Sequence, residues 1–172
     1  RDDVESRGLG DVYKRQGQEF GQEREWSEAR ELDWFLLQNE LNQGLQDYVA
    51  ELLKLYRKYP CMYEIDNSWD GFEWINADDA DRSIYSFVRK SKDGKNNMLF
   101  VCNFTPVARP DYRVGVPKKK TYKLVLDSDA AEFGGEGTEK SVSYKAVKSE
   151  CDGREFSFAY PLSGYGIAVF KY

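Results

Sequence analysis

Histidine is absent from the 172 residues of this chain, and its absence excludes several kinds of site. A Ser-His or Cys-His nucleophilic pair needs an imidazole as its general base, so neither pair can be built from this sequence. Imidazole is also the most common transition-metal ligand in proteins. The sequence therefore predicts no metal site and no cofactor.

Cysteine is scarce as well. Cys61, Cys102 and Cys151 are the only three, and their wide spacing forms no CxxC pair, which excludes zinc ribbons and thioredoxin-type redox motifs. An odd number of cysteines without a secretory signal favours a reducing compartment, so we expect a cytoplasmic protein. The longest apolar run falls well short of the roughly 18 residues that cross a bilayer, and we expect no membrane partner.

A surplus of positive charge is missing too. The formal net charge of the chain is −5, whereas a protein that binds nucleic acid normally presents a basic face. The only basic run, Lys118 to Lys120, directly follows Pro117 and is typical of a solvated turn between strands. We therefore expect no nucleic-acid partner.

Aromatic residues, in contrast, are abundant. Tyr, Phe and Trp make up 15% of the chain, within a hydrophobic share of 41%, which is enough for a packed soluble core. Aromatic side chains pack well on the pleated surface of a sheet, and flat rings also stack on the faces of sugars. Composition thus predicts a β-rich fold and leaves sugar binding open.

One helix is predicted, between Asn39 and Pro60. An asparagine at position 39 or 42 can cap its first turn, and the residue before a proline disfavours helical geometry, which ends it. Its apolar positions recur at helical spacing and share one face, which comprises Leu41, Leu45, Val49, Leu52 and Tyr56. We expect this face to leave a sizeable apolar patch exposed, unless the domain that follows covers it.

From Gly71 onward the apolar residues recur every second position, as they do in strands. Asp93-Gly94 is a strong hairpin signal between two of these strands. The candidate strands are Phe72–Asn76, Ser83–Lys90, Met98–Phe104, Tyr112–Gly115, Thr121–Asp127, Val142–Val147, Glu155–Tyr160 and Tyr165–Tyr172. The predicted fold class is mainly β, with a C-terminal antiparallel sandwich of about seven to eight strands preceded by one α-helix.

Two stretches precede the helix. Residues 1–16 are charged and aperiodic, and we expect them to be a leader that is either non-native or disordered. Residues 17–38 form an irregular block rich in Gly, Gln and Glu. Functional residues concentrate in loops of this kind, so its acidic residues are candidates for a site. They are Glu19, Glu23 and Glu25, beside Trp26.

A series of motifs runs along the chain from residue 17 to its last strand. It comprises Gly17 to Trp26, Glu31 to Trp34, Gly71 to Ile75, Cys102 to Val107, Tyr112 to Pro117 and Leu126 to Asp129. This series resembles the C-terminal part of bacterial glycogen branching enzymes, members of the alpha-amylase superfamily. The Asn-Phe-Thr-Pro motif followed by Tyr-Arg-x-Gly-x-Pro is the most specific element of the resemblance.

The resemblance implies a transferase that cleaves an alpha-1,4 bond of a glucan and forms an alpha-1,6 branch, with its active site on a (β/α)8 barrel. Residues 17–62 would be the end of that barrel, and residues 63–172 the all-β domain. The family's catalytic Asp, Glu and Asp lie on earlier strands, and none maps onto this sequence. An apolar strand that precedes Gly17 in the family is replaced here by Tyr13 to Gln16. We therefore expect a truncated barrel and a fragment that is inactive alone.

The resemblance also implies which residues approach the substrate, an alpha-glucan such as glycogen or an amylose-like chain. They lie in the loop after the last barrel strand and are Glu19, Gln22, Glu25 and Trp26. Two other hypotheses stay open. One is a non-catalytic carbohydrate-binding module, which would be favoured by exposed, coplanar rings at Trp69 and Trp74 or by a row of tyrosines on one sheet face. The other is a domain that only stabilises the barrel.

Overall fold

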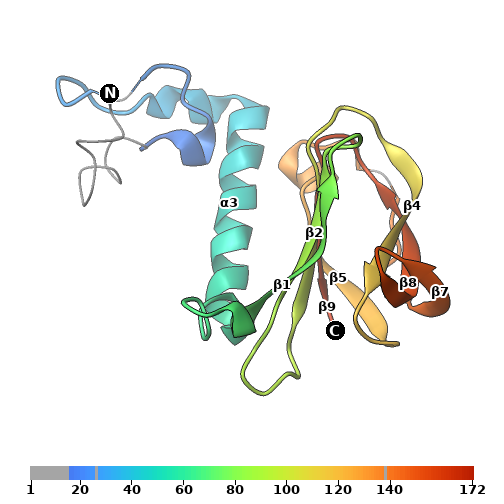
Figure 1. Cartoon of the computed structure of the whole chain (residues 1–172). Helices are drawn as coiled ribbons and strands as arrows, with labels where there is room; N and C mark the ends of the chain where they lie inside the picture. Colours follow the sequence, from blue (N-terminus) through green and yellow to red (C-terminus); the bar gives the residue numbers. More distant parts are fainter. Residues whose placement is uncertain (1–15, 26, 138) are drawn as a thin grey trace.

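The computed structural model describes residues 16–25, 27–137 and 139–172. Within these ranges one α-helix, α3 (Glu40–Lys58), stands beside a two-layered β-sandwich (Figure 1). The mainly β fold predicted from the sequence is confirmed. The predicted leader, residues 1–16, lies outside the described residues apart from Gln16. No helix among the described residues is both long and apolar enough to cross a lipid bilayer.

Nine strands form the sandwich. They are β1 (Phe72–Asp79), β2 (Ile84–Arg89), β3 (Met98–Asn103), β4 (Arg109–Val116), β5 (Thr121–Asp127), β6 (Ser143–Lys145), β7 (Val147–Cys151), β8 (Arg154–Leu162) and β9 (Ile167–Lys171). One sheet has the order β1-β2-β3-β9-β5-β6 and the other β4-β8-β7, and every pairing is antiparallel.

The strand predicted over residues 142–147 is in fact two strands. β6 pairs with β5 in the six-stranded sheet, whereas β7 pairs with β8 in the three-stranded sheet. Ala146, buried between them, donates its backbone N–H to Lys120 across 3.0 Å. The chain passes from one layer to the other at this corner, a change of sheet that a period of two cannot reveal.

The main core lies between the two sheets. Side chains of both inner faces interdigitate there, and Phe170 of β9 is fully buried among aromatic rings. Its ring centroid lies 5.1 Å from that of Tyr160, 5.2 Å from that of Phe158 and 5.8 Å from that of Tyr144. The rings approach edge to face, an arrangement that adds to the stabilisation from burial itself.

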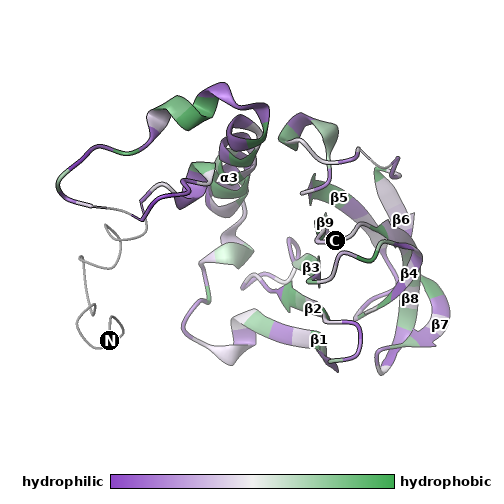
Figure 2. Cartoon of the chain, turned by 90° about the horizontal axis from the view of Figure 1, so that it is seen from above, coloured by the Kyte–Doolittle hydropathy of each residue, from purple (hydrophilic) through white to green (hydrophobic). Residues whose placement is uncertain are grey.

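A second, smaller core lies on the outer face of the six-stranded sheet, where α3 packs (Figure 2). Leu99 and Val101 of β3 point into the sandwich, while Met98 and Phe100 point toward the side that the helix covers. All six residues of β3 are buried for this reason. A strand covered on both faces becomes uniformly apolar, even within an antiparallel sheet.

The helix itself begins where the sequence predicts. The Asn39 side chain accepts the backbone N–H of Leu41 across 3.1 Å and caps the first turn, and Pro60 follows the last turn. The predicted apolar face, however, is shared between two environments. Leu52 packs on the sheet together with Tyr48 and Leu55, whereas the stripe of Leu41, Leu45, Leu53 and Tyr56 stays exposed.

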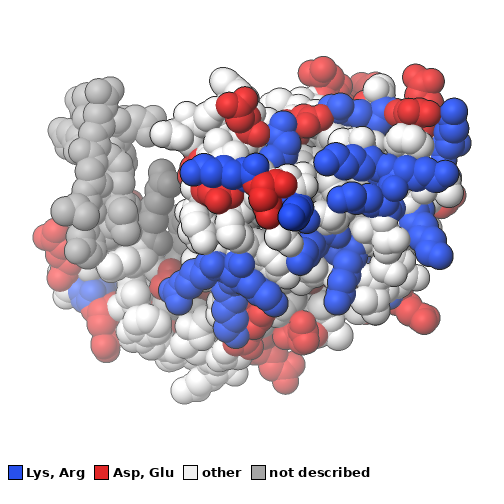
Figure 3. Space-filling view, turned by 90° about the horizontal axis from the view of Figure 1, so that it is seen from below, with Lys and Arg blue, Asp and Glu red and all other residues white. Residues whose placement is uncertain are grey.

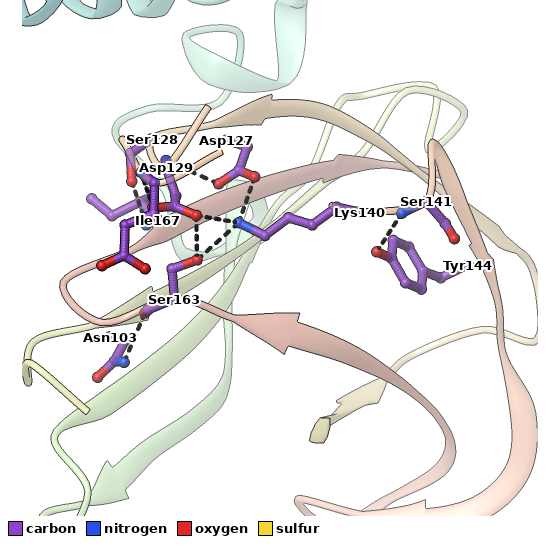
Figure 4. A network of polar contacts seen from close by, with 10 residues as sticks. Asn103, Asp127, Ser128, Asp129, Lys140, Ser141, Tyr144, Ser163 and Ile167 are labelled. Atoms are coloured by element: carbon purple, nitrogen blue, oxygen red, sulfur yellow. Dashed lines mark hydrogen bonds and ion pairs between the residues drawn. The ribbon is translucent and has the colours of Figure 1, made fainter. Parts of the chain in front are cut away.

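A buried lysine fastens the loop between β5 and β6 to the sandwich (Figure 4). The Lys140 ammonium lies 2.6 Å from a carboxylate oxygen of Asp127 and 3.4 Å from one of Asp129, and it donates to the Ser163 hydroxyl across 3.0 Å. Ser163 in turn donates to Asp129 across 2.7 Å. Only 4% of the Lys140 side chain is exposed, so these partners replace its water. These contacts tie the end of the loop to β5 and to the residue that follows β8.

Positive charge gathers on one face although the net charge of the chain is negative. Figure 3 shows Lys and Arg side chains crowding the face seen from below in Figure 1. The turns after β2 and β4 lie at this end of the sandwich (Figure 1), and they carry exposed lysines at Lys92, Lys95 and Lys118 to Lys120. The absence of a nucleic-acid partner therefore stays a prediction.

Candidate functional site

Residues 17–38, here called the rim block, are built from turns and two short 3-10 helices, η1 (Gln18–Phe20) and η2 (Trp34–Gln38). The Phe20 side chain is fully buried, and its ring lies 5.0 Å from that of Trp34. Asn42 of α3 donates its side-chain amide to the Phe20 carbonyl across 2.7 Å. The rim block is therefore anchored on the first turns of α3.

Two of the four predicted contact residues hold the rim block together. The Glu19 carboxylate accepts the backbone N–H of Gly17 across 2.9 Å, which closes the turn that begins the block. Gln22 accepts the backbone N–H of Asp33 through its side-chain oxygen and donates its amide to the Arg24 carbonyl, each across 2.9 Å. Both polar ends of Gln22 are thus occupied within the chain, so its amide shapes the loop.

The pair of Arg24 and Asp33 is the electrostatic centre of the rim block. The Arg24 guanidinium donates to both carboxylate oxygens of Asp33, and its Nε lies 2.7 Å from Oδ2. Asp33 is buried with respect to solvent, while Arg24 is largely exposed. The hydrogen bond from Arg24 lowers the pKa of the Asp33 carboxyl, which therefore stays ionised. This two-pronged contact joins the two ends of the loop from residue 24 to residue 33.

Glu25 is the predicted residue that remains available to a ligand. Its side chain is exposed, and its carboxylate has no hydrogen-bond or ion-pair partner among the described residues. Its backbone carbonyl accepts a hydrogen bond from Arg30, which fixes the direction of the loop. Trp26, the fourth predicted residue, lies outside the described residues.

The β-sandwich supports the rim block through α3, which also contacts the loop between β5 and β6. The short helix η5 (Ala131–Phe133) lies within the loop between β5 and β6 that Lys140 fastens, and the ring of Phe133 lies 5.4 Å from that of Tyr48. A Cβ at Gly44 would lie 2.6 Å from the Phe133 carbonyl oxygen, so only glycine lets the loop come this close. The contact lies one turn from the site where the rim block is anchored, so the sandwich positions that block.

A second candidate site lies at the start of β1. A hollow of about 500 Å³ is lined by aromatic rings of Trp69, Phe72 and Trp74 together with Arg89. Trp69 is 80% exposed and Trp74 45% exposed, which is unusual for side chains of this size. Their rings flank Phe72, with centroids 6.1 Å and 4.9 Å from it. The two tryptophans are therefore exposed, which is one of the two properties that the carbohydrate-binding hypothesis expects of them.

Arg89 lines this hollow and is fixed by contacts with the segment before β1. It donates to the backbone carbonyl of Met62 across 3.0 Å and to the Asp66 carboxylate across 2.6 Å. Sequence reasoning named Trp69 and Trp74 but not Phe72 or Arg89 as parts of a site. The alternation of Phe72 and Trp74 along β1 was an available signal. No local pattern, in contrast, indicates that Arg89 contacts Met62 and Asp66, which lie 27 and 23 positions before it in the chain.

The described residues contain no group of three or more His, Cys, Asp or Glu side chains placed to hold a metal ion. The buried thiols are poor nucleophiles, because burial raises the pKa of Cys61 and of Cys102 to about 11. What the arrangement offers is binding, through an exposed carboxylate at Glu25 and an open row of rings at Trp69 and Trp74.

Comparison with known proteins extends over both candidate sites. The chain is 56% identical over 156 residues to the 1,4-alpha-glucan branching enzyme GlgB of Butyrivibrio fibrisolvens. The match covers 91% of this chain and 24% of that protein. It is 41% identical over 156 residues to the GlgB of Aquifex aeolicus, with 91% of this chain and 25% of that protein covered. The chain thus spans about a quarter of the length of these relatives.

The sandwich also matches a family model. The model is described as the alpha amylase C-terminal all-beta domain, and it matches residues 74–172, from the middle of β1 to the last residue. These residues comprise eight complete strands and both faces of the main core. With more than half of its length matched, the chain belongs to the family of the alpha amylase C-terminal all-beta domain.

Proposed function

We propose that this chain is the C-terminal region of a 1,4-alpha-glucan branching enzyme, in which residues 17–62 end the catalytic barrel and residues 63–172 form the all-β domain. The observation that carries the proposal is the similarity to branching enzymes over 156 residues, which includes the rim block as well as the sandwich. A domain shared only as a generic support would match in the sandwich and not in the loop ahead of α3.

In this proposal the whole enzyme cleaves an alpha-1,4 bond and transfers the glucan chain to a 6-hydroxyl, in the cytoplasm and without a metal or cofactor. Such chemistry needs two carboxyl groups about 5–9.5 Å apart, one of them an acid. We assign those carboxylates to other parts of the enzyme, and this chain alone is then inactive. Its part is to present a rim to the glucan.

The rim residues take different roles under this proposal. Glu25 contacts the glucan, because its exposed carboxylate can accept hydrogen bonds from sugar hydroxyls. Glu19 and Gln22 hold the loop in place through the bonds they make to Gly17 and Asp33. Trp26 adds a ring on which a sugar can stack.

The test has two steps. The genomic DNA upstream of the codon for Gly17 is read for an in-frame barrel, and the chain is incubated with amylose while new alpha-1,6 linkages are counted. We expect a barrel in the DNA and no branching by the chain alone. Branching by the 172 residues on their own would show that the catalytic groups lie within them and would overturn their assignment elsewhere.

A second function, binding of an alpha-glucan by the all-β domain itself, is favoured by the exposure of Trp69 and Trp74. Titration of the chain with a maltooligosaccharide, followed by tryptophan fluorescence, measures it. Trp69→Ala should abolish the response, whereas Tyr165→Ala, which removes another exposed ring outside this hollow, should leave it unchanged. Equal responses from the two variants would exclude a specific site at the hollow.

A further inference from the structure

The two sheets of the sandwich meet along a seam between their edge strands, β1 and β4. Asp152, in the turn between β7 and β8, bridges β1 and β4 across the seam. Its carboxylate accepts the side-chain amide of Asn76 on β1 and the backbone N–H of Gly115 on β4, each across 2.8 Å. A Cβ at Gly115 would lie 2.2 Å from the Cys151 carbonyl oxygen, so glycine is required for the turn to close the seam.

Beside this closure the seam opens into a hollow of about 500 Å³, here called the seam hollow. Three arginines line it, Arg82 from the turn after β1 and Arg109 and Arg113 from β4, together with Tyr112 and Asp111. Arg109 and Arg113 both lie on the edge strand β4, where an irregularity between Arg109 and Tyr112 interrupts the alternation of side chains, and both line the hollow. A hollow of this volume is large enough for a small ligand.

The three guanidinium groups differ in how they are satisfied. Arg82 donates its Nε–H to Asp79 across 2.9 Å and forms an ion pair with the same carboxylate at 2.7 Å. Arg113 donates to the Ser157 hydroxyl across 3.1 Å. Arg109 makes no side-chain hydrogen bond or ion pair among the described residues, and its Nε is buried without a partner.

Tyr112 supplies a second unsatisfied group at the same place. The residue is only 4% exposed, and its hydroxyl is buried with no hydrogen-bond partner. The Arg82 guanidinium lies over its ring, 5.6 Å from the centroid. Burial raises the pKa of this phenol, so it keeps its proton and remains a donor. Unpartnered buried polar groups are rare in folded proteins, and two of them line one hollow.

We propose that the seam hollow binds a phosphate group, either inorganic phosphate or the phosphate of a small sugar ester, with Arg109 and Arg113 as its principal ligands. The arginine fork matches a phosphate through paired N–H donors. Asp79 already neutralises Arg82, so the positive charge that attracts the ligand comes from Arg109 and Arg113. The exposed carboxylate of Asp111 offsets part of this charge. A neutral glucan has no such charge to offer, so this site is distinct from the proposed rim.

The experiment is a titration of the 172-residue chain with inorganic phosphate and, separately, with glucose 6-phosphate, followed by NMR of the arginine Nε–H signals and by calorimetry. We expect saturable binding that shifts the Arg109 and Arg113 signals. Equal affinity for both ligands assigns recognition to the phosphate group alone, whereas tighter binding of the ester assigns the site to a sugar phosphate. Both outcomes support the proposal, and the absence of saturable binding of either ligand overturns it.

Matched variants separate a built site from a general effect of charge. Arg109→Gln should weaken phosphate binding by about tenfold or more, because it removes an entire charged fork, and Arg109→Lys should recover only part of the affinity. Lys119→Gln makes the same change of charge on an exposed turn and should have no effect. If Lys119→Gln weakens binding as much as Arg109→Gln does, the proposal is wrong.

The fold of each variant is checked by circular dichroism before the titration. Should Arg109→Gln fail to fold, Arg113→Gln provides the test, because Arg113 is exposed and its one side-chain bond goes to Ser157. The same weakening is expected, and unchanged affinity in Arg113→Gln contradicts the assignment of ligands. None of these measurements uses branching activity, so the phosphate site can fail while the proposed function stands.

Discussion

The β-sandwich and the rim block are stabilised in different ways. The sandwich has a continuous core of side chains from two sheets, in which Phe170, Val101 and Ile84 are all fully buried. The rim block buries little besides Phe20 and Asp33, and its order comes from a few hydrogen bonds between neighbouring turns. A region of the first kind unfolds only as a whole, whereas one of the second kind can open locally.

The largest loss of stability is expected from the aromatic cluster of the main core. Phe170→Ala removes a fully buried ring that three other rings contact, so the cavity left behind adds to the lost burial. We expect the free energy of unfolding to fall by about 3–5 kcal/mol. Denaturation in urea, monitored by fluorescence and circular dichroism, measures it, and Tyr165→Ala at an exposed ring is the control. A loss of below about 1 kcal/mol would mean that the sandwich is not one cooperative unit.

How far the sequence predicts these two regions follows from the same difference. The alternation of Ile84, Ser86 and Val88 with their neighbours, and the Asp93-Gly94 turn, are local signals, and β2 and β3 form where those signals place them. The cap at Asn39 and the stop at Pro60 are local as well. Elements with a regular period or a defined cap could therefore be predicted to within a few residues.

The rim block has no period to detect. Its central contact joins Arg24 to Asp33, nine positions apart, and either residue alone is typical of a solvated loop. Asp79 likewise stands in an acidic stretch with no local signal for burial, yet its side chain is 7% exposed and paired with Arg82. The seam hollow combines residues of β4 with Cys151 at the end of β7 and Arg82 in the turn after β1. Such sites depend on tertiary contacts, which a single sequence does not encode as a local pattern.

An intermediate effect is expected at the link between the regions. Lys140→Met removes a buried ammonium and leaves the carboxylates of Asp127 and Asp129 without its charge. We expect a loss of about 3 kcal/mol in the free energy of unfolding, because breaking a buried ion pair leaves an uncompensated charge. Lys148→Met, which removes an exposed partner of Glu155, is the matched control and should change it little. Equal effects in the two variants would contradict the role of Lys140 in fastening the loop.

A smaller effect is expected where the loop meets the helix. Gly44→Ala gains about 1 kcal/mol of helix propensity, but its Cβ would lie 2.6 Å from the Phe133 carbonyl oxygen, so the loop and α3 must separate. We expect a net destabilisation of about 1–2 kcal/mol, since overpacking outweighs propensity. Urea denaturation measures it, and Gln43→Ala, one position earlier on the helix, is the control. A stabilised Gly44→Ala variant would show that this contact does not hold the rim block to the sandwich.

The smallest effect on global stability, and the sharpest test of the comparison, is at Asp33. Its pKa is lowered in the folded chain by the hydrogen bond from Arg24. Order in the rim block should therefore be complete above the unfolded value of about 3.9 and be lost as the pH falls through the lower, folded value. Asp33→Asn should open the loop from residue 24 to residue 33 at every pH. Hydrogen exchange of the Asp33 and Leu36 amides measures this opening, and Asp47→Asn on the exposed side of α3 is the control.

The urea midpoint of the sandwich should stay unchanged in Asp33→Asn, because the loop opens without the core. If Asp33→Asn lowers that midpoint as strongly as Phe170→Ala does, the rim block is part of the cooperative core and the distinction between the two regions fails.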